Sequence, residues 1–132
     1  MNLSTNPRIT VKGKIIDRKD PDRPRREIVI EKTESRKLPI KDYPITHKIK
    51  PEGLEVIVMS SQGECCQASL HRFTKASRFG EGAYIGSATK RLEDRSQSNQ
   101  FRNFLQQAGV FTPGTQVNLD CEKRGEVIRV YL

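Results

Sequence analysis

Short apolar segments of strand length, separated by turns and charged loops, most constrain what this 132-residue chain can fold into. Segment 8–16 shows the pattern, because apolar and polar residues alternate and Ile9, Val11 and Ile15 fall on one face. A period of two predicts a strand that buries one side. We predict further strands at 27–33 and 54–60, in a partner segment from residue 64, in two halves of a hairpin within 70–95, and at 115–122 and 126–132. The chain is therefore expected to be mainly β.

Helical spacing is clear in one segment only. Ser98 suits its N-cap and Gly109 suits its end. Its apolar residues recur at the spacing of one helix face: Phe101, Phe104, Leu105 and Ala108. We also expect a short helix from Pro44, since proline fits the first helical turn, and a short strand over 37–40. After the main helix, Pro113 and the glycine that follows it suit the centre of a type II turn.

The charge balance indicates a polyanionic partner. The formal net charge is +8 and the sequence pI is near 9.7. Such an excess favours nucleic acid, an anionic membrane surface or an acidic protein. No apolar run approaches the ~20 residues of a membrane span, and no signal-peptide core follows Met1. We expect a flexible lead at 1–7 and a single domain at 8–132, monomeric, in the cytoplasm of a bacterium and away from membranes.

The cysteines and histidines do not form a pattern for metal binding or nucleophilic catalysis. Cys65 and Cys66 are adjacent, whereas zinc sites separate paired cysteines by about two to four residues; the third cysteine is Cys121. We expect these thiols to be buried and reduced. His47 and His71 are the only histidines, and neither has a neighbourhood that predicts a nucleophile with its base.

A magnesium-dependent nuclease site is the other chemistry to weigh. Many restriction nucleases combine Pro-Asp with a later Glu/Asp-x-Lys. Here Asp22 follows Pro21, but the only acid with a lysine two positions later is Asp17, which precedes it in the same charged loop. Magnesium sites need carboxylates that converge on a rigid frame. We therefore expect binding without cleavage in this domain, and no metal or other cofactor.

Segment 70–95 is the strongest candidate for a binding element. Its glycine-rich tip, Gly80 to Gly82, lies between two strand-like halves and predicts a long hairpin arm. Such an arm projects from the body, and its side chains reach phosphates or base edges. The candidate DNA-binding residues in this arm are Arg72, Lys75, Ser77, Arg78, Lys90, Arg91 and Arg95. We expect Lys75, Lys90 and Arg91 to anchor phosphates. Base edges would be contacted by Arg72, Arg78 and Arg95, because the arginine fork fits guanine.

Two further basic groups lie earlier in the chain. The loop at 17–26 carries Arg18, Lys19, Arg23, Arg25 and Arg26, and its aspartates offset much of this charge, so DNA contact and simple solvation both stay open. A smaller group consists of Lys32, Arg36 and Lys37. Two such arms on a compact barrel would straddle a duplex.

The order of these elements resembles the B3-type DNA-binding pseudobarrel of plant transcription factors and of the effector domains of EcoRII-like restriction endonucleases. The closing pattern matches best, with a helix through Phe101 and Phe104, then Gly109, then the turn at Pro113, then two strands. The absence of tryptophan favours the restriction-enzyme branch. The resemblance implies an open seven-stranded barrel with two short helices, in the order strand, strand, helix, three strands, helix, two strands.

In that branch the resemblance implies an effector domain of a restriction–modification system. Two recognition arms enter the major groove of a short, CCWGG-like site, and a separate C-terminal catalytic domain cuts the DNA. Segment 70–95 would be the C-terminal arm, while 17–26 and 32–37 both remain candidates for the N-terminal arm. Two other classes stay open: a barrel that binds RNA or single strands, with Phe73, Phe79 and Tyr84 stacking on bases, and a basic protein-interaction module such as a phage inhibitor.

Overall fold

The computed structural model describes residues 7–19, 25–38, 54–73, 82–87, 95–125 and 127–132. Of residues 95–98 and of Phe73, it describes the backbone only. Its elements follow in the order β1 (Arg8–Arg18), β2 (Arg25–Glu31), α1 (Lys32–Ser35), β3 (Leu54–Met59), β4 (Cys65–Phe73), β5 (Gly82–Ser87), α2 (Arg95–Gln107), β6 (Gln116–Arg124) and β7 (Val127–Tyr131). This is the order that the resemblance implied, and the predicted mainly β fold is confirmed.

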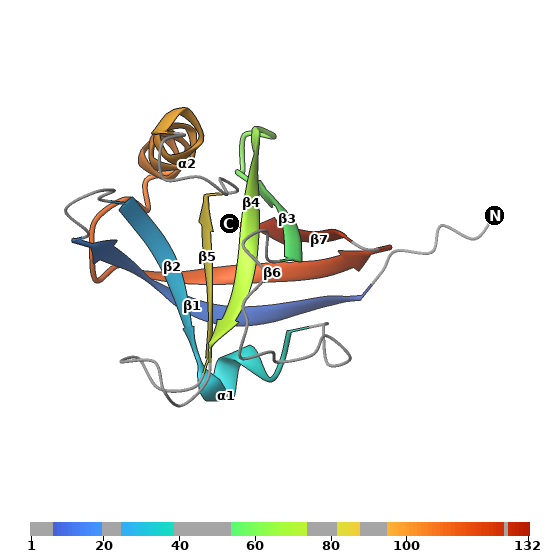
Figure 1. Cartoon of the computed structure of the whole chain (residues 1–132). Helices are drawn as coiled ribbons and strands as arrows, with labels where there is room; N and C mark the ends of the chain where they lie inside the picture. Colours follow the sequence, from blue (N-terminus) through green and yellow to red (C-terminus); the bar gives the residue numbers. More distant parts are fainter. Residues whose placement is uncertain (1–6, 20–24, 39–53, 74–81, 88–94, 126) are drawn as a thin grey trace.

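The described strands form one closed barrel in the order β1-β2-β5-β4-β3-β7-β6 (Figure 1). The barrel closes because the first half of β1 pairs with β6, from Arg8 opposite Glu122 to Lys14 opposite Gln116. The second half of β1 pairs with β2. Every pair is antiparallel except β3 with β7, which are parallel. One long strand therefore links two walls of the barrel.

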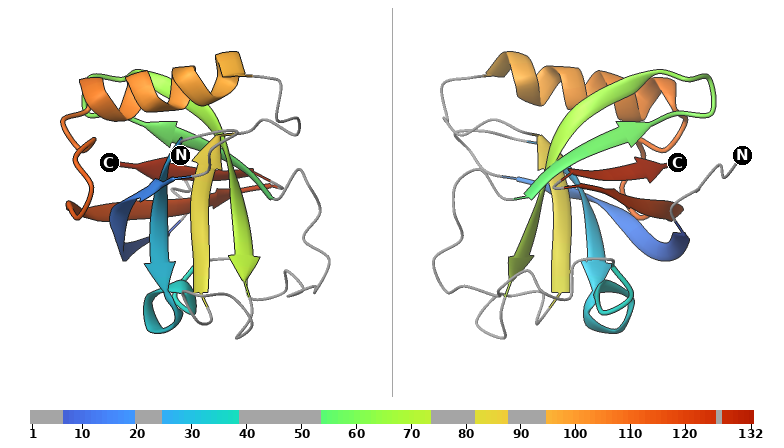
Figure 2. Two further views of the ribbon diagram at one scale, coloured as in Figure 1. Left: turned by 60° about the vertical axis from the view of Figure 1, so that its left-hand side comes forward. Right: turned by 90° about the vertical axis from the view of Figure 1, so that its right-hand side faces the viewer.

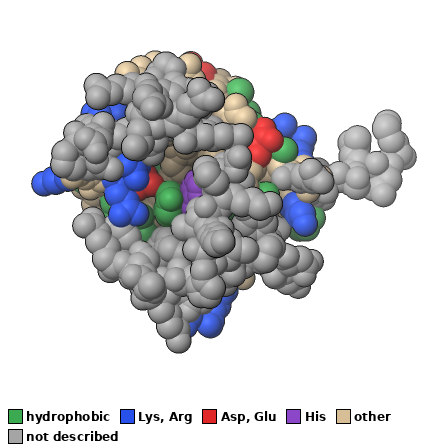
Figure 3. All heavy atoms as spheres, in the orientation of Figure 1, with side chains coloured by type: hydrophobic (Ala, Val, Ile, Leu, Met, Phe, Trp, Pro, Cys, Tyr) green, Lys and Arg blue, Asp and Glu red, His purple; other side chains and the backbone are tan. Residues whose placement is uncertain are grey.

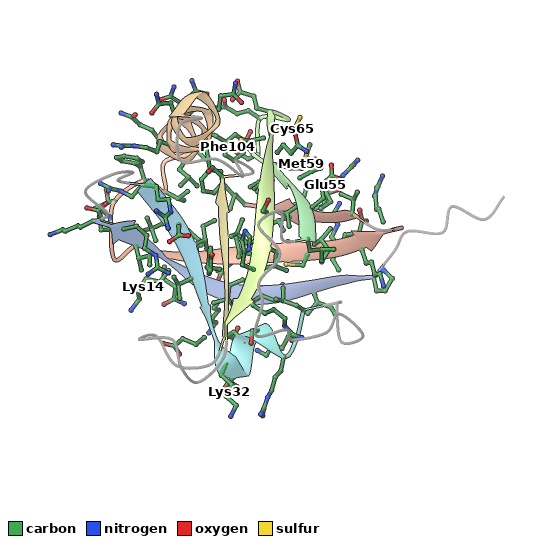
Figure 4. The ribbon with its side chains drawn as sticks, in the orientation of Figure 1. Lys14, Lys32, Glu55, Met59, Cys65 and Phe104 are labelled. Carbon is green, nitrogen blue, oxygen red and sulfur yellow. The ribbon has the colours of Figure 1, made fainter. Side chains whose placement is uncertain are left out.

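The barrel interior is filled by the predicted apolar faces, and the helices lie at its two ends. Val11 and Ile15 of β1 are buried, as are Leu119 and Cys121 of β6. Helix α2 packs on β2, β4 and β5 at one end, and α1 packs on β1, β2 and β5 at the other (Figure 2). Phe104 points from α2 into the barrel (Figure 4), next to the buried Phe101 and Leu105.

Both predicted glycine signals after the main helix are confirmed. Gly109 has φ +77°, and the amide of Val110 donates to the carbonyl of Leu105, which together form the usual glycine-terminated helix end. At Gly114 φ is +89°, and the amide of Thr115 donates to the carbonyl of Thr112, as a type II turn requires.

Several predicted boundaries were wrong. The segment 17–26 was predicted as a loop, yet Asp17 and Arg18 belong to β1 and Arg25 and Arg26 to β2. The strand predicted at 27–33 ends at Glu31, and Lys32 begins the four-residue helix α1. Residues 37–38 are not a strand. The helix expected from Pro44, and residues 39–40, lie outside the described residues.

The projecting arm predicted at 70–95 is also corrected. Its base is barrel wall, because Leu70, Ala83 and Ile85 are buried in the core. Arg95 lies in α2, which begins three residues before the predicted cap at Ser98. The predicted tip around Gly80 lies outside the described residues.

Candidate nucleic-acid interface

The wall made by β1, β2, β5 and β4 presents one outer face whose composition follows from strand register. Ile28 pairs with Ile15 on one side and with Ile85 on the other, and all three are buried. Residues one position away therefore face outward. They form rows across the wall: Arg18 and Arg25, then Ile16, Glu27, Gly86 and Ser69, then Lys14, Val29, Tyr84 and His71. Figure 3 views this face and shows basic side chains, an acidic one and a histidine on it.

Two arginines flank a buried carboxylate at one end of this face. Glu27 is only 1% exposed although it points to the outer side of the wall. Arg18 donates a hydrogen bond from Nε to Oε1 of Glu27, and Nε of Arg25 lies 3.8 Å from Oε2. The two arginine side chains are 22% and 19% exposed. Because opposite residues in antiparallel strands are close and diagonal neighbours lie within reach of long side chains, the register itself produces this triad.

Gly86 provides the space that the Glu27 carboxylate occupies. A Cβ added at Gly86 would lie 3.3 Å from Oε2 and 3.5 Å from Cγ of Glu27. The distance to Oε2 is tight, whereas the distance to Cγ is an ordinary van der Waals contact, so a side chain at position 86 would require the Glu27 carboxylate to shift by a few tenths of an ångström. A glycine in the middle of a strand often marks such a close approach.

An aromatic pair lies beside the arginines. The rings of His71 and Tyr84 are stacked, with centroids 4.9 Å apart and planes 18° from parallel. The guanidinium carbon of Arg18 lies 5.6 Å from the centroid of Tyr84, within the range of a cation–π contact. His71 is buried and Tyr84 is half-buried. The face therefore combines fixed arginines with the partly exposed ring of Tyr84, a combination that suits phosphates, base edges and stacked bases.

Arg26, one of the predicted DNA-binding residues, makes contacts that hold the barrel end together. Its Nη1 lies 2.5 Å from Oδ1 of Asp17 on the paired strand, and its Nε donates to the carbonyl of Phe111 at 3.3 Å. Its guanidinium carbon also lies 4.5 Å from the centroid of the Phe111 ring. Three contacts of this kind and a side chain only 15% exposed indicate a structural role.

The outer face of β1 carries a row of cations, of which only Arg18 was predicted as a binding candidate. Alternate positions place Arg8, Lys12, Lys14 and Arg18 on one side of the strand. Lys12 and Lys14 are exposed, and their partners on β6 are the exposed amides Asn118 and Gln116. Lys14 points away from the barrel in Figure 4. Together with Thr33 and Glu34 of α1, both lysines border a pocket of about 290 Å³. The alternation in 8–16 was the signal that would have identified them.

The connections predicted as DNA-binding arms leave opposite ends of this wall. The β1–β2 connection leaves where Arg18 pairs with Arg25. The β4–β5 connection leaves where Phe73 pairs with Gly82, and Gly82 in turn pairs with Glu31 at the far end of β2. Exposed Lys19 begins the first connection. Arg23, Lys75, Ser77, Arg78, Lys90 and Arg91 lie outside the described residues.

The third predicted basic group lies in and after α1, at the same end as the β4–β5 connection. Lys32 is half-buried, and its side chain extends outward in Figure 4. Arg36 and Lys37 are exposed, and Lys37 forms an ion pair of 2.7 Å with Glu34. That hydrogen bond and the one from the backbone amide of Lys12 lower the pKa of Glu34.

Arg72 and Arg95 do not join the outer face. Arg72 pairs with Ala83 and alternates with His71, so its side chain leaves β4 on the same side as Leu70. Arg95 belongs to the first turn of α2. The wall thus brings Arg18 and Arg25 together with Lys14, and it separates them from Arg26, Arg72 and Arg95.

A similar triad lies at the other end of β1, on the wall formed with β6 and β7. Glu122 is 2% exposed and accepts a hydrogen bond from Nε of Arg124, while Nε of Arg8 lies 4.0 Å away. The guanidinium carbon of Arg8 is 3.8 Å from the centroid of Tyr131. The hydrogen bond from Arg124 lowers the pKa of Glu122 and raises that of Arg124.

The thiols differ from one another in exposure. Cys65 is exposed, which corrects the expectation of three buried thiols, while Cys66 is half-buried and Cys121 is buried. Burial raises the pKa of Cys66, and it raises that of Cys121 to about 12. Cys65 and Cys66 differ in exposure because neighbouring residues on a β-strand point to opposite faces. Among the described residues, no group of three or more His, Cys, Asp or Glu side chains is placed to hold a metal ion.

Comparisons of the chain with protein-family models, with curated proteins and with solved structures found no match. In the part of the chain that the structure describes, no helix is long and apolar enough to cross a membrane.

Proposed function

We propose that this chain binds double-stranded DNA in a sequence-specific manner through the outer face of β1, β2, β5 and β4. The observation that carries the proposal is the pair of arginines, Arg18 and Arg25, fixed on one outer wall beside Lys14 and the stacked rings of Tyr84 and His71. The net charge of +8 favours a polyanion as the partner. Arginines present a fork that fits guanine O6 and N7, whereas exposed lysines suit phosphates.

The dimensions of the wall support a duplex. From Arg25 to Glu31, β2 spans six residue steps, or about 20 Å. The major groove is roughly 12 Å wide. Connections that leave opposite ends of this wall are therefore spaced to contact the backbones on both sides of a groove, and the two arginines lie at the end where the β1–β2 connection leaves.

The role in restriction rests on the resemblance to B3-type effector domains, and the element order supports it. In this role the domain, a monomer in a bacterial cytoplasm, recognises a short CCWGG-like site. It contributes no catalytic group and no cofactor, and a separate domain cuts the DNA. Arg18 and Arg25 then contact bases, while Lys14 and Lys12 contact phosphates. The predicted arm residues make further contacts of both kinds: Lys75, Arg78, Lys90 and Arg91.

Selection of bound duplexes from a random library tests this function. We expect one short consensus sequence to be enriched. With about six phosphate contacts, the binding constant should fall with salt at a log–log slope of about −5. Arg18→Ala should weaken binding to the selected site by ~1–3 kcal/mol and weaken binding to random duplex much less. An equal loss on both duplexes would remove base contact from Arg18.

The stacked pair of Tyr84 and His71 favours a second candidate, which is binding of single-stranded nucleic acid. Aromatic side chains stack on unpaired bases with little sequence preference. Tyr84→Ala would then weaken binding to a single strand more than binding to a duplex, and a competing single strand would displace the duplex.

A further inference from the structure

We infer that Glu27 determines the sequence specificity of this face by positioning Arg18 and Arg25, and that Gly86 is required for this role. The inference rests on the proposed function and identifies a residue that contacts no DNA itself. It explains why the Glu27 carboxylate is buried on the wall that we propose binds DNA.

The geometry shows how Glu27 acts on the arginines. One oxygen of its carboxylate accepts from Nε of Arg18, and the other lies 3.8 Å from Nε of Arg25. A guanidinium has several N–H donors, and contact through Nε orients the plane of the whole fork. Because the carboxylate is 1% exposed and packed against Gly86, it is itself held in place. The fork of Arg18 therefore has a defined direction before DNA arrives, which reduces the ordering entropy lost on binding. The ion pair with the same carboxylate keeps Arg25 beside it.

The effect that the Glu27 charge should have on DNA affinity distinguishes a positioning role from simple electrostatic attraction of DNA. A carboxylate on a DNA-binding face repels phosphates and neutralises nearby arginines, so it weakens binding that depends on charge alone. A site built only for affinity would lack Glu27. A site built to discriminate between sequences benefits from it, since arginines paired with a carboxylate gain little from a phosphate and more from a well-placed guanine edge.

Glu27→Gln is the principal test, because it removes the charge with little change in volume. We expect affinity for the selected duplex to fall about tenfold, as charge-assisted orientation of the arginines is lost. Affinity for random duplex should rise about two- to fivefold, with a steeper salt dependence, because a negative charge has left the face. If both affinities fall in parallel, or neither changes, Glu27 has no role in specificity.

Gly86→Ala provides a second variant that keeps the charge. Its Cβ would lie 3.3 Å from Oε2 of Glu27, which requires a small shift of the carboxylate that holds the arginines. We therefore expect the affinity for the selected duplex to fall while the salt dependence on random duplex is unchanged. Unchanged affinity for the selected duplex in this variant would contradict the requirement for Gly86.

Glu122→Gln is the matched control. Glu122 is equally buried and equally placed between two arginines, but it lies on the wall formed with β6 and β7. It should leave the ratio of selected to random affinity unchanged. A fall in the ratio as large as that of Glu27→Gln would show that any lost buried carboxylate disturbs the barrel, and would overturn the inference.

The arginines can also be observed without DNA, which separates this inference from the proposed function. In ¹⁵N spectra of the free protein, the Nε–H signals of Arg18 and Arg25 should be dispersed and slow to exchange. They should move toward the position of exposed arginines in both Glu27→Gln and Gly86→Ala. Unchanged signals would refute positioning by Glu27 whatever the chain binds. If the wild-type chain binds no duplex while these signals do move, the proposed function fails and the ordering of the arginines stands.

Discussion

The backbone of Gly13 passes so close to Ile28 that a Cβ on the glycine would lie 2.7 Å from Cγ2 of the isoleucine. The same Cβ would also contact Cδ1 of Leu119 at 3.4 Å, and both Ile28 and Leu119 are fully buried, so the core leaves little room to relieve the overlap. Gly13 pairs with Val117 of β6, and the next residue, Lys14, pairs with both β6 and β2, so the glycine lies where the two walls meet.

Gly13→Ala should therefore destabilise the barrel by about 1–3 kcal/mol through overpacking. Urea unfolding followed by circular dichroism measures the change. Asn118→Ala, at an exposed position of β6, is the control and should change stability by less than about 0.5 kcal/mol. Equal stability of Gly13→Ala and wild type would show that β1 and β2 have room to separate.

Lys14→Ala should weaken binding to selected and random duplexes alike, because an exposed lysine contacts phosphate and not bases. The slope of the logarithm of the binding constant against the logarithm of the salt concentration should become shallower by about 1. Fluorescence anisotropy at several salt concentrations measures both quantities. Lys123→Ala, an equal loss of exposed charge on β6 away from the proposed face, should leave the slope nearly unchanged. If the two variants behave alike, binding follows net charge and not this wall.

The stability of the protein should fall in acid partly through Glu122. Its pKa in the folded state is below the ordinary value of 4.5, chiefly because Arg124 donates a hydrogen bond to it. A group whose pKa is lowered by folding stabilises the folded state above its unfolded pKa, and this contribution is lost as the pH falls through the folded pKa. The difference in unfolding free energy between wild type and Glu122→Gln should thus be present at pH 7 and shrink below about pH 4.5. A difference that is independent of pH would contradict this assignment.

The three thiols should react at separate rates. Exposed Cys65 should be modified first by a thiol reagent in the native protein, and half-buried Cys66 more slowly, since burial raises its pKa. Cys121, buried and with a pKa of about 12, should react only on unfolding. Mass spectrometry of the modified peptides assigns each step. Rapid modification of Cys121 under native conditions would show that the β6 wall opens readily.

Much of the fold was predictable because its signals are local. Alternation identified the inward faces of β1 and β6, and the recurrence of Phe101, Phe104 and Leu105 identified the buried face of α2. Gly109 and Gly114 marked the following turns, since positive φ angles favour glycine. Helix α1 was missed because four residues show no helical period and its N-cap, Glu31, makes no side-chain cap hydrogen bond.

The candidate site was less predictable because it depends on register between strands that are distant in sequence. Arg18 and Arg25 were predicted as binding residues, but charges near prolines suggested a loop, and the strand ends that hold them were missed. The pairing of β2 with β5 brings Glu27 against Gly86, and a single sequence does not reveal that pairing. Lys12 and Lys14, in contrast, had a visible signal in the alternation of β1.

Chemical-shift mapping with a selected duplex shows which wall of the barrel the DNA contacts. We expect amide and side-chain signals of Lys14, Arg18, Arg25 and Tyr84 to shift on titration. Signals of Ile57 and Arg129, paired on the opposite β3–β7 wall, should stay in place. Shifts that concentrate on the β3–β7 wall, or no shifts at low salt, would contradict the proposed function.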